Sequence, residues 1–144
     1  MSLYQHKLDP EVFENARANL RQHGWGKGYA VCEDGSLCLI GSLRVALGET
    51  INYDPDGKPF LSGNTRKTWV APEAQSIFPY SLLVEQLVQK LRPADSDPLD
   101  DDWDHVTNWN DLIATTHEQV DALLAEAAEI VRIQNRLEEK INNV

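Results

Sequence analysis

Residues 116–142 have the sequence THEQVDALLAEAAEIVRIQNRLEEKIN, which has a clear apolar stripe at helical spacing. Thr116 and Gln119 have the spacing of a capping box, in which each side chain bonds the backbone N–H of the other residue. We therefore predict a C-terminal helix over about residues 117–142. One face of this helix is apolar and is expected in a core. This face consists of Val120, Leu123, Leu124, Ala127, Ile130 and Val131.

Beyond Val131 the apolar stripe of this helix weakens. Gln134 and Glu138 interrupt it, whereas Leu137 and Ile141 continue it. At about 1.5 Å per residue the helix is about 40 Å long, which is more than a small domain needs. We therefore expect its C-terminal half to project, to pack on a partner or to pair with a second copy of the chain.

Three further helices are predicted upstream. Asp9 is an N-cap candidate, and Pro10 suits the first helical position. Gly24 suits the end of the same helix. Two later segments have apolar residues at helical spacing. The predicted helices cover residues 10–23, 40–47 and 80–91.

Between the first two of these helices the sequence predicts a β-hairpin. Three glycines within residues 24–28 exclude a helix there. Residues 29–32 and 37–39 flank the turn signal Asp34-Gly35, so we expect them to pair as two short strands. A lone hairpin is only marginally stable, so it must pack on the helices.

Two long segments between the helices are rich in turn-forming or acidic residues. Residues 49–79 contain several Pro, Gly and Asn residues, and residues 93–108 are rich in aspartate. Both are expected to be loops. We therefore predict one α+β domain over residues 1–144, dominated by helix. Three to four helices pack around one short β-hairpin, with long loops and a long C-terminal helix.

The charge and composition of the chain narrow the classes of function. The 144 residues carry a formal net charge of −10, and such a surface repels nucleic-acid phosphates and anionic membranes. The sequence shows neither an apolar run of membrane length nor an N-terminal signal peptide, so we expect a cytoplasmic protein. Cys32 and Cys38 are then expected as free thiols. Direct binding to nucleic acid or to a membrane is not expected.

Three motifs of the chain resemble those of a family of proteins. They are the Gly-Trp turn at Gly24, the Gly-x-x-Cys-x-x-Gly segment beginning at Gly35, and Trp109-Asn110-Asp111 before the Thr-capped helix. Together they resemble an uncharacterised family of small proteins from actinobacteria and their phages. The resemblance implies an accessory protein, encoded by a phage, that acts in the cytoplasm of a bacterial host. It implies no particular activity.

The resemblance covers the two ends of the chain and not its middle. Ser42 stands where the family usually has Ala, and Gln119 stands where it usually has Glu. Gln119 still suits a capping box. Thr115 replaces a residue that is usually basic, which removes any anion contact that a basic side chain would make there.

Cys38 is a candidate nucleophile. It lies just before the predicted helix at residues 40–47, and a helix N-terminus lowers the pKa of a thiol. His105 with Asn110 or Asp111 would complete a catalytic set if the fold brings these residues together. The alternative is a buried structural cysteine, which is the commoner role and the one that we favour.

A candidate ligand site combines the aromatic residues and glycines of the motifs. In the functional interpretation the two Trp rings stack on a polar ligand, Asn and Asp bond it, and glycine amides hold an anion. In the structural interpretation, which we favour, the rings anchor loops to the core and Asn and Asp form side-chain turns. The candidate ligand-binding residues are Trp25, Gly28, Cys38, Trp109, Asn110 and Asp111.

The sequence predicts neither a metal site nor a cofactor. Asp100, Asp102 and Asp104 have the 1, 3, 5 spacing of a calcium loop, and Asp111 falls at position 12. His105 stands at position 6, where such a loop has Gly, and position 12 is usually Glu. The chain lacks the Cys and His pairs of zinc sites and the motifs of nucleotide-binding proteins and hydrolases.

We therefore predict a non-enzymatic intracellular binding or accessory protein that engages a host protein or sequesters a small polar ligand. The acidic surface, the long loops and the overlong last helix motivate this hypothesis. A small cysteine-dependent enzyme that uses Cys38 is the alternative. A third hypothesis is a helical protein that forms a homodimer through residues 131–141.

Overall fold

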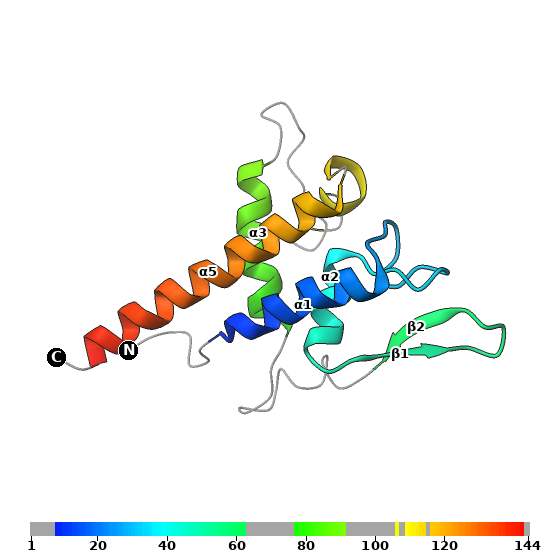
Figure 1. The fold of residues 1–144 in the computed structure, drawn as a ribbon, viewed down its shortest axis with the longest axis horizontal. Helices are drawn as coiled ribbons and strands as arrows, with labels where there is room; N and C mark the ends of the chain where they lie inside the picture. The colour runs from blue at the N-terminus through cyan, green and yellow to red at the C-terminus, as the bar shows by residue number, and fades with distance from the viewer. Residues whose placement is uncertain (1–7, 63–76, 92–105, 107–108, 115, 143–144) are drawn as a thin grey trace.

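The computed structural model describes residues 8–62, 77–91, 106, 109–114 and 116–142 (Figure 1). The predicted class is confirmed, because helices dominate these residues and an antiparallel strand pair accompanies them. In chain order the elements are α1 (Pro10–His23), α2 (Leu39–Ala46), β1 (Thr50–Tyr53), β2 (Pro59–Ser62), α3 (Ile77–Leu91), the π-helical turn η2 (Trp109–Ile113) and α5 (His117–Asn142).

The two helices with the strongest capping signals lie where the sequence predicts them. The Asp9 carboxylate accepts a hydrogen bond of 2.9 Å from the N–H of Glu11, and α1 ends at Gly24, which has a φ of 91°. At the start of α5 the N–H of Gln119 donates to Thr116 Oγ1 at 3.3 Å, and the N–H of Thr116 donates to Gln119 Oε1 at 3.1 Å. The predicted capping box is therefore confirmed.

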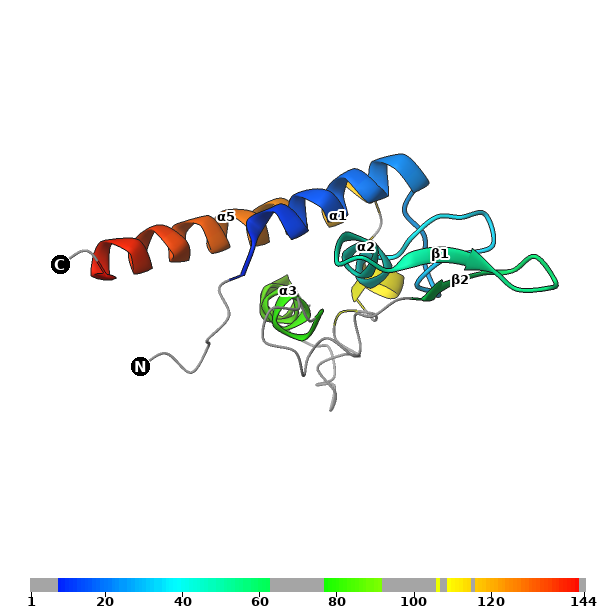
Figure 2. The same ribbon diagram turned by 90° about the horizontal axis from the view of Figure 1, so that it is seen from below.

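Helices α1 and α5 lie side by side, and α3 crosses α5 at a steep angle (Figures 1 and 2). The rings of Phe13 and Tyr80 meet edge to face with their centroids 5.3 Å apart. The Tyr80 hydroxyl also accepts a hydrogen bond of 3.0 Å from the N–H of Asp9, which ties the start of α1 to α3. The buried residues of α1 and α5 are Val12, Phe13, Ala16, Leu20, Val120, Leu123, Leu124, Ala127, Ala128 and Val131.

Ion pairs join α1 to α5. Arg17 donates to Asp121 through Nε at 2.9 Å and through Nη2 at 3.0 Å, and it donates to Glu14 through Nη1 at 2.8 Å. Arg132 donates to the other oxygen of Glu14 at 2.7 Å. Arg132 holds the pKa of the Glu14 carboxyl below its usual value, and Arg17 does the same for the pKa of Asp121.

The strand pair lies in a different segment from the predicted one. Only isolated bridges form around the Asp34-Gly35 turn, Trp25 with Leu37 and Val31 with Leu37. The predicted second strand is cut short because α2 begins at Leu39. The prediction of strands at residues 29–32 and 37–39 is therefore wrong.

The observed hairpin lies inside residues 49–79, which we predicted to be a loop. Strands β1 and β2 pair in the register Thr50 with Ser62 through Tyr53 with Pro59. Asp54 Oδ1 accepts hydrogen bonds from the N–H groups of Asp56 at 2.9 Å and Lys58 at 2.8 Å, which closes the connecting turn. Ile51 and Leu61 pack against the core, so tertiary contacts help to hold the hairpin in place.

One helix boundary also needs correction. Helix α3 begins at Ile77 rather than at residue 80, because Pro79 falls in its first turn, where a missing N–H costs no helical hydrogen bond. The segment before α5 forms a π-helical turn. Of the predicted loop at residues 93–108 only Val106 is described, and it is buried.

In the described segments, no helix is long and apolar enough to cross a membrane.

Candidate functional site

The π-helical turn η2 places Asn110 among the predicted site residues. Asn110 is 1% exposed. Its Oδ1 accepts hydrogen bonds from Trp25 Nε1 at 2.8 Å and from the N–H of Leu39 at 3.1 Å. Its Nδ2 donates to the carbonyl oxygen of Gly26 at 3.1 Å and to Asp111 Oδ1 at 2.9 Å. The Asn110 amide therefore joins residues 24–28, which we call the glycine loop, to the start of α2 and to η2.

Asp111 adds a second link between η2 and the glycine loop. Its Oδ1 accepts a hydrogen bond of 2.9 Å from the N–H of Gly28. The turn is closed by the N–H of Ala114, which donates to the carbonyl oxygen of Trp109 at 2.8 Å. Trp109 is buried in the core, and Figure 2 shows the turn, in yellow, next to α2. The fold thus brings the three Trp-Asn-Asp residues together with the loop that holds Trp25.

This arrangement supports the structural interpretation of the motif. A carboxamide offers two N–H donors and an oxygen that accepts two hydrogen bonds. Asn110 uses all four inside the protein. Its amide therefore has no hydrogen-bonding capacity left for a ligand.

Cys38 caps helix α2 from a buried position. It is 4% exposed, and its Sγ accepts a hydrogen bond of 3.3 Å from the N–H of Gly41. Burial raises the pKa of the Cys38 thiol, and this effect exceeds the lowering by the hydrogen bonds from Gly41 and Ile40. The expected lowering of this pKa at the helix start is therefore wrong. A raised pKa keeps the thiol protonated near neutral pH, and only the thiolate is a good nucleophile.

The structure describes only part of the alternative catalytic set. Asp111 accepts a hydrogen bond from the glycine loop, and His105 lies outside the described residues. Cys32 and Cys38 are both free thiols. Cys32 lies against the glycine loop, since a Cβ on Gly26 would come within 2.6 Å of Cys32 Sγ.

In the described part of the chain, no group of three or more His, Cys, Asp or Glu residues could hold a metal ion. The aspartates of the calcium-like spacing, Asp100, Asp102 and Asp104, lie outside that part, as does His105.

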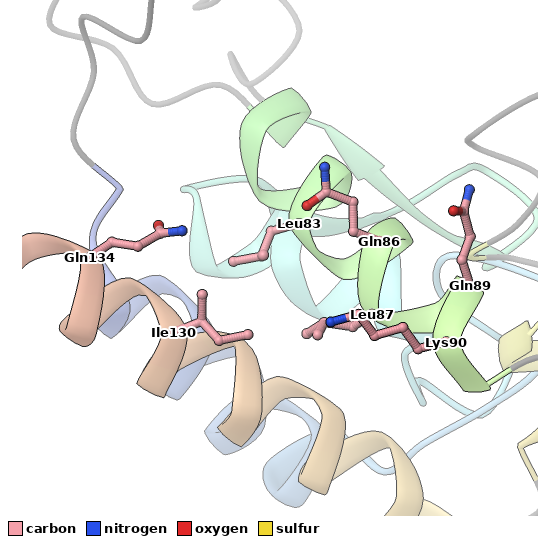
Figure 3. Close-up of a pocket in the computed structure, with 7 residues that line it drawn as sticks. All are labelled: Leu83, Gln86, Leu87, Gln89, Lys90, Ile130 and Gln134. Carbon is pink, nitrogen blue, oxygen red and sulfur yellow. The ribbon is translucent and has the colours of Figure 1, made fainter. Parts of the chain in front are cut away.

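A groove runs between α3 and α5, with a volume of about 610 Å³ (Figure 3). Leu83 and Leu87 of α3 and Ile130 of α5 form its apolar lining. Figure 3 shows Leu83 and Gln134 pointing toward each other across the gap, with Lys90 extending from α3 toward α5. The polar lining residues are Gln86, Gln89, Lys90 and Gln134.

The C-terminal end of α5 continues this apolar surface. Figure 2 shows the end running past the start of α1 and beyond α3. Ile133, Leu137 and Ile141 are 43%, 54% and 72% exposed. At about 100° per residue, Ile130, Leu137 and Ile141 lie within about 40° of one another around the helix. We call this surface the α5 strip: Leu83, Leu87, Ile130, Ile133, Leu137 and Ile141.

The sequence pattern predicts the α5 half of this strip and misses the groove. Leu83 and Leu87 have the spacing of core residues. Leu87 is buried as this spacing predicts, whereas Leu83 is half-buried beside the groove. Gln134 interrupts the apolar stripe of α5 and lines the groove.

The model of a family of unknown function, DUF6197, matches residues 5–130 of the chain. The match therefore ends at Ile130, and the projecting end of α5 lies beyond it. No curated protein and no solved structure matches the chain.

Proposed function

The chain belongs to this family of unknown function, DUF6197, and from that premise we propose that it is a non-enzymatic protein that binds a partner protein through the α5 strip. The observation that carries the proposal is the continuity of the strip, from the groove to the exposed Leu137 and Ile141. Single exposed apolar residues are ordinary, whereas a contiguous patch marks an interaction site. Apolar residues at helical spacing beside a groove suit an amphipathic helix of the partner.

Two other observations support binding over catalysis and over capture of a small polar ligand. Asn110 has its hydrogen-bonding groups occupied within the protein. Cys38 is buried with a raised thiol pKa. Asn110 and Cys38 thus support the structural interpretation, and the α5 strip is a surface that a partner can reach.

The setting of this function is part of the proposal. The resemblance of the three motifs supports an actinobacterial or phage origin, and the charge of −10 disfavours a nucleic-acid or membrane partner. We therefore propose an accessory protein, encoded by a phage, that acts in the bacterial cytoplasm. Its partner is then a protein of the same cell.

Site-specific photocrosslinking in cells that carry the gene tests the binding surface. A photoreactive amino acid replaces Gln134 in one variant and Leu137 in another, because both residues are exposed on or beside the strip. A third variant carries it at Ala18, an exposed position on α1. We expect the same discrete adduct from Gln134 and Leu137 and no such adduct from Ala18.

The control variant at Ala18 distinguishes binding at a specific surface from non-specific crosslinking. Equal adduct patterns from all three positions, or no adduct from either strip position, would contradict the proposal. Correct folding of each variant is checked by its urea midpoint, which exposed substitutions should change little.

A further inference from the structure

We infer that the α5 strip is occupied by the α5 helix of a second copy of this chain, with the two helices antiparallel. The inference rests on the proposed function and names the partner of the same surface. Each copy carries both parts of the interface, a groove that receives a helix and a projecting helix end with apolar residues. An interface of this kind is self-complementary and closes as a two-fold dimer.

The lengths of the two parts match. Ile130 lies in the groove and Ile141 lies at the far end of the strip. Eleven residues separate them, which is about 17 Å along the helix. When Ile141 of one copy meets Ile130 of the other, Leu137 of the first copy meets Gln134 of the second. The exposed apolar residues of each copy then enter the groove of the other, and every contact is made twice.

Two of the charges beside the strip fit this antiparallel register. Glu129 and Lys140 lie on the same side of the strip, about 20° apart around the helix. Same-side residues face each other when two helices pack antiparallel, and such flanking charges set the orientation of helix pairs. The register places Lys140 of one copy about 3 Å along the axis from Glu129 of the other.

Glu129 is accessible for this contact. Its side chain is 55% exposed, and the ion pairs that it makes with Arg132 and Arg136 of its own chain are long, at 3.7 Å each. Two ion pairs between Glu129 and Lys140 then form per dimer. A parallel pair would face Lys140 toward the opposite side of the strip, where Gln134 lies, and would gain no such pair.

The size of the contact surface determines the expected affinity of the dimer. A strip of three helical turns per copy is smaller than a standard protein interface, so the dimer is weak and depends on concentration. We therefore expect monomer at low concentration and dimer at high concentration, without a change of fold.

Sedimentation of the full chain over a concentration series tests the inference. We expect the mass to rise toward that of two chains as the concentration approaches about 1 mM, which populates even weak specific complexes. The double variant Leu137→Glu, Ile141→Lys is expected to stay monomeric. Phe60→Ser removes an exposed apolar residue of the hairpin and should leave the dimer unchanged. A single-chain mass at all concentrations, or an undiminished dimer in the double variant, would overturn the inference.

A charge exchange tests the antiparallel register. Lys140→Glu and Glu129→Lys each place like charges opposite each other twice in their own dimer. Mixing the two variants restores two opposite-charge contacts in the mixed pair. We expect each variant alone to dimerise several-fold more weakly than the wild type and the mixture to form heterodimers preferentially. Equal homodimers and no preference for the mixed pair would overturn the proposed register.

Failure of the inference is distinguishable from failure of the proposed function. A monomeric chain that still gives a discrete photocrosslink from Leu137 to another protein refutes the second copy as the partner and retains protein binding by the strip. A monomeric chain without such an adduct refutes both. An adduct with the mass of two chains supports both.

Discussion

The Asn110 side chain shows how a single residue can hold three segments together. Its amide bonds the Trp25 ring, the N–H that begins α2, the glycine loop and the neighbouring Asp111. Buried donors that lose their partner cost about 1–3 kcal/mol each, which is more than a satisfied hydrogen bond contributes. The fold therefore depends on this residue more than on an average polar side chain.

Asn110→Ala should lower the free energy of unfolding by about 3 kcal/mol, because Trp25 Nε1 and the N–H of Leu39 both lose their acceptor. Urea denaturation followed by circular dichroism measures this loss. Asn15→Ala, on the exposed side of α1, is the matched control and should stay within about 0.5 kcal/mol of the wild type. Equal urea midpoints for the two variants would show that the hydrogen bonds of Asn110 do not stabilise the fold.

Cys38 leads to a prediction about reactivity. Burial raises the pKa of its thiol, so the reactive thiolate is scarce until the pH exceeds the ordinary thiol range. Near pH 7.5 (about one unit below the ordinary thiol pKa), iodoacetamide should modify Cys38 at least about tenfold more slowly in the folded chain than in urea. Peptide mass spectrometry measures the rate at each cysteine. Rapid modification of Cys38 in the folded protein would contradict this prediction and would support the alternative hypothesis of a cysteine-dependent enzyme.

At the scale of elements, ion pairs fasten α1 to α5. The pKa values of Glu14 and Asp121 are lowered in the folded state, first by Arg132 and by Arg17 respectively. Carboxyl groups with lowered pKa values add stability above their unfolded pKa, which is near 4 for both residue types. This contribution disappears as the pH falls through the lowered folded values. The α1–α5 contact is therefore expected to weaken on acidification below about pH 4.

Arg17→Gln should reduce the free energy of unfolding at pH 7 by about 1 kcal/mol, since the pairs are partly exposed to solvent. The variant should also lose less stability than the wild type between about pH 5 and pH 3. Urea midpoints at several pH values measure both effects. Arg136→Gln is the control, because Arg136 is 63% exposed and lies 3.7 Å from Glu129. An unchanged acid dependence in Arg17→Gln would contradict the assigned pairs.

The elements also show which local signals were sufficient. The caps at Asp9 and Thr116 predict the first residues of α1 and α5, because a side-chain cap acts within three residues. The hairpin was misplaced because Asp34-Gly35 and Asp56-Gly57 are equal turn signals in sequence. The two candidate turns differ in the contacts that their flanking residues make in the folded chain. Cys38 ends the first candidate by capping α2, and Leu61 packs the second onto the core.

At the scale of the whole molecule, the proposed binding surface extends from the folded unit onto the projecting end of α5. The hydrogen bonds of Asn110 and the core of α1, α3 and α5 hold the folded unit together. The family match ends at Ile130. Leu137 and Ile141 lie beyond that point on a helix end that projects from the rest (Figure 1). Sequence periodicity predicts this end, since Gln134 and Glu138 interrupt the apolar stripe there. The groove could not be predicted, because it depends on the angle at which α3 crosses α5.

The most direct test of the proposed binding surface is the yield of the photocrosslink from Gln134 in a chain that also carries Leu137→Glu and Ile141→Lys. Both substituted residues are more than half exposed, so the free energy of unfolding should change by less than about 0.5 kcal/mol. We predict that the adduct falls at least about tenfold, the change that corresponds to about 1.4 kcal/mol of binding energy. An undiminished adduct in a normally folded variant would contradict binding through the α5 strip.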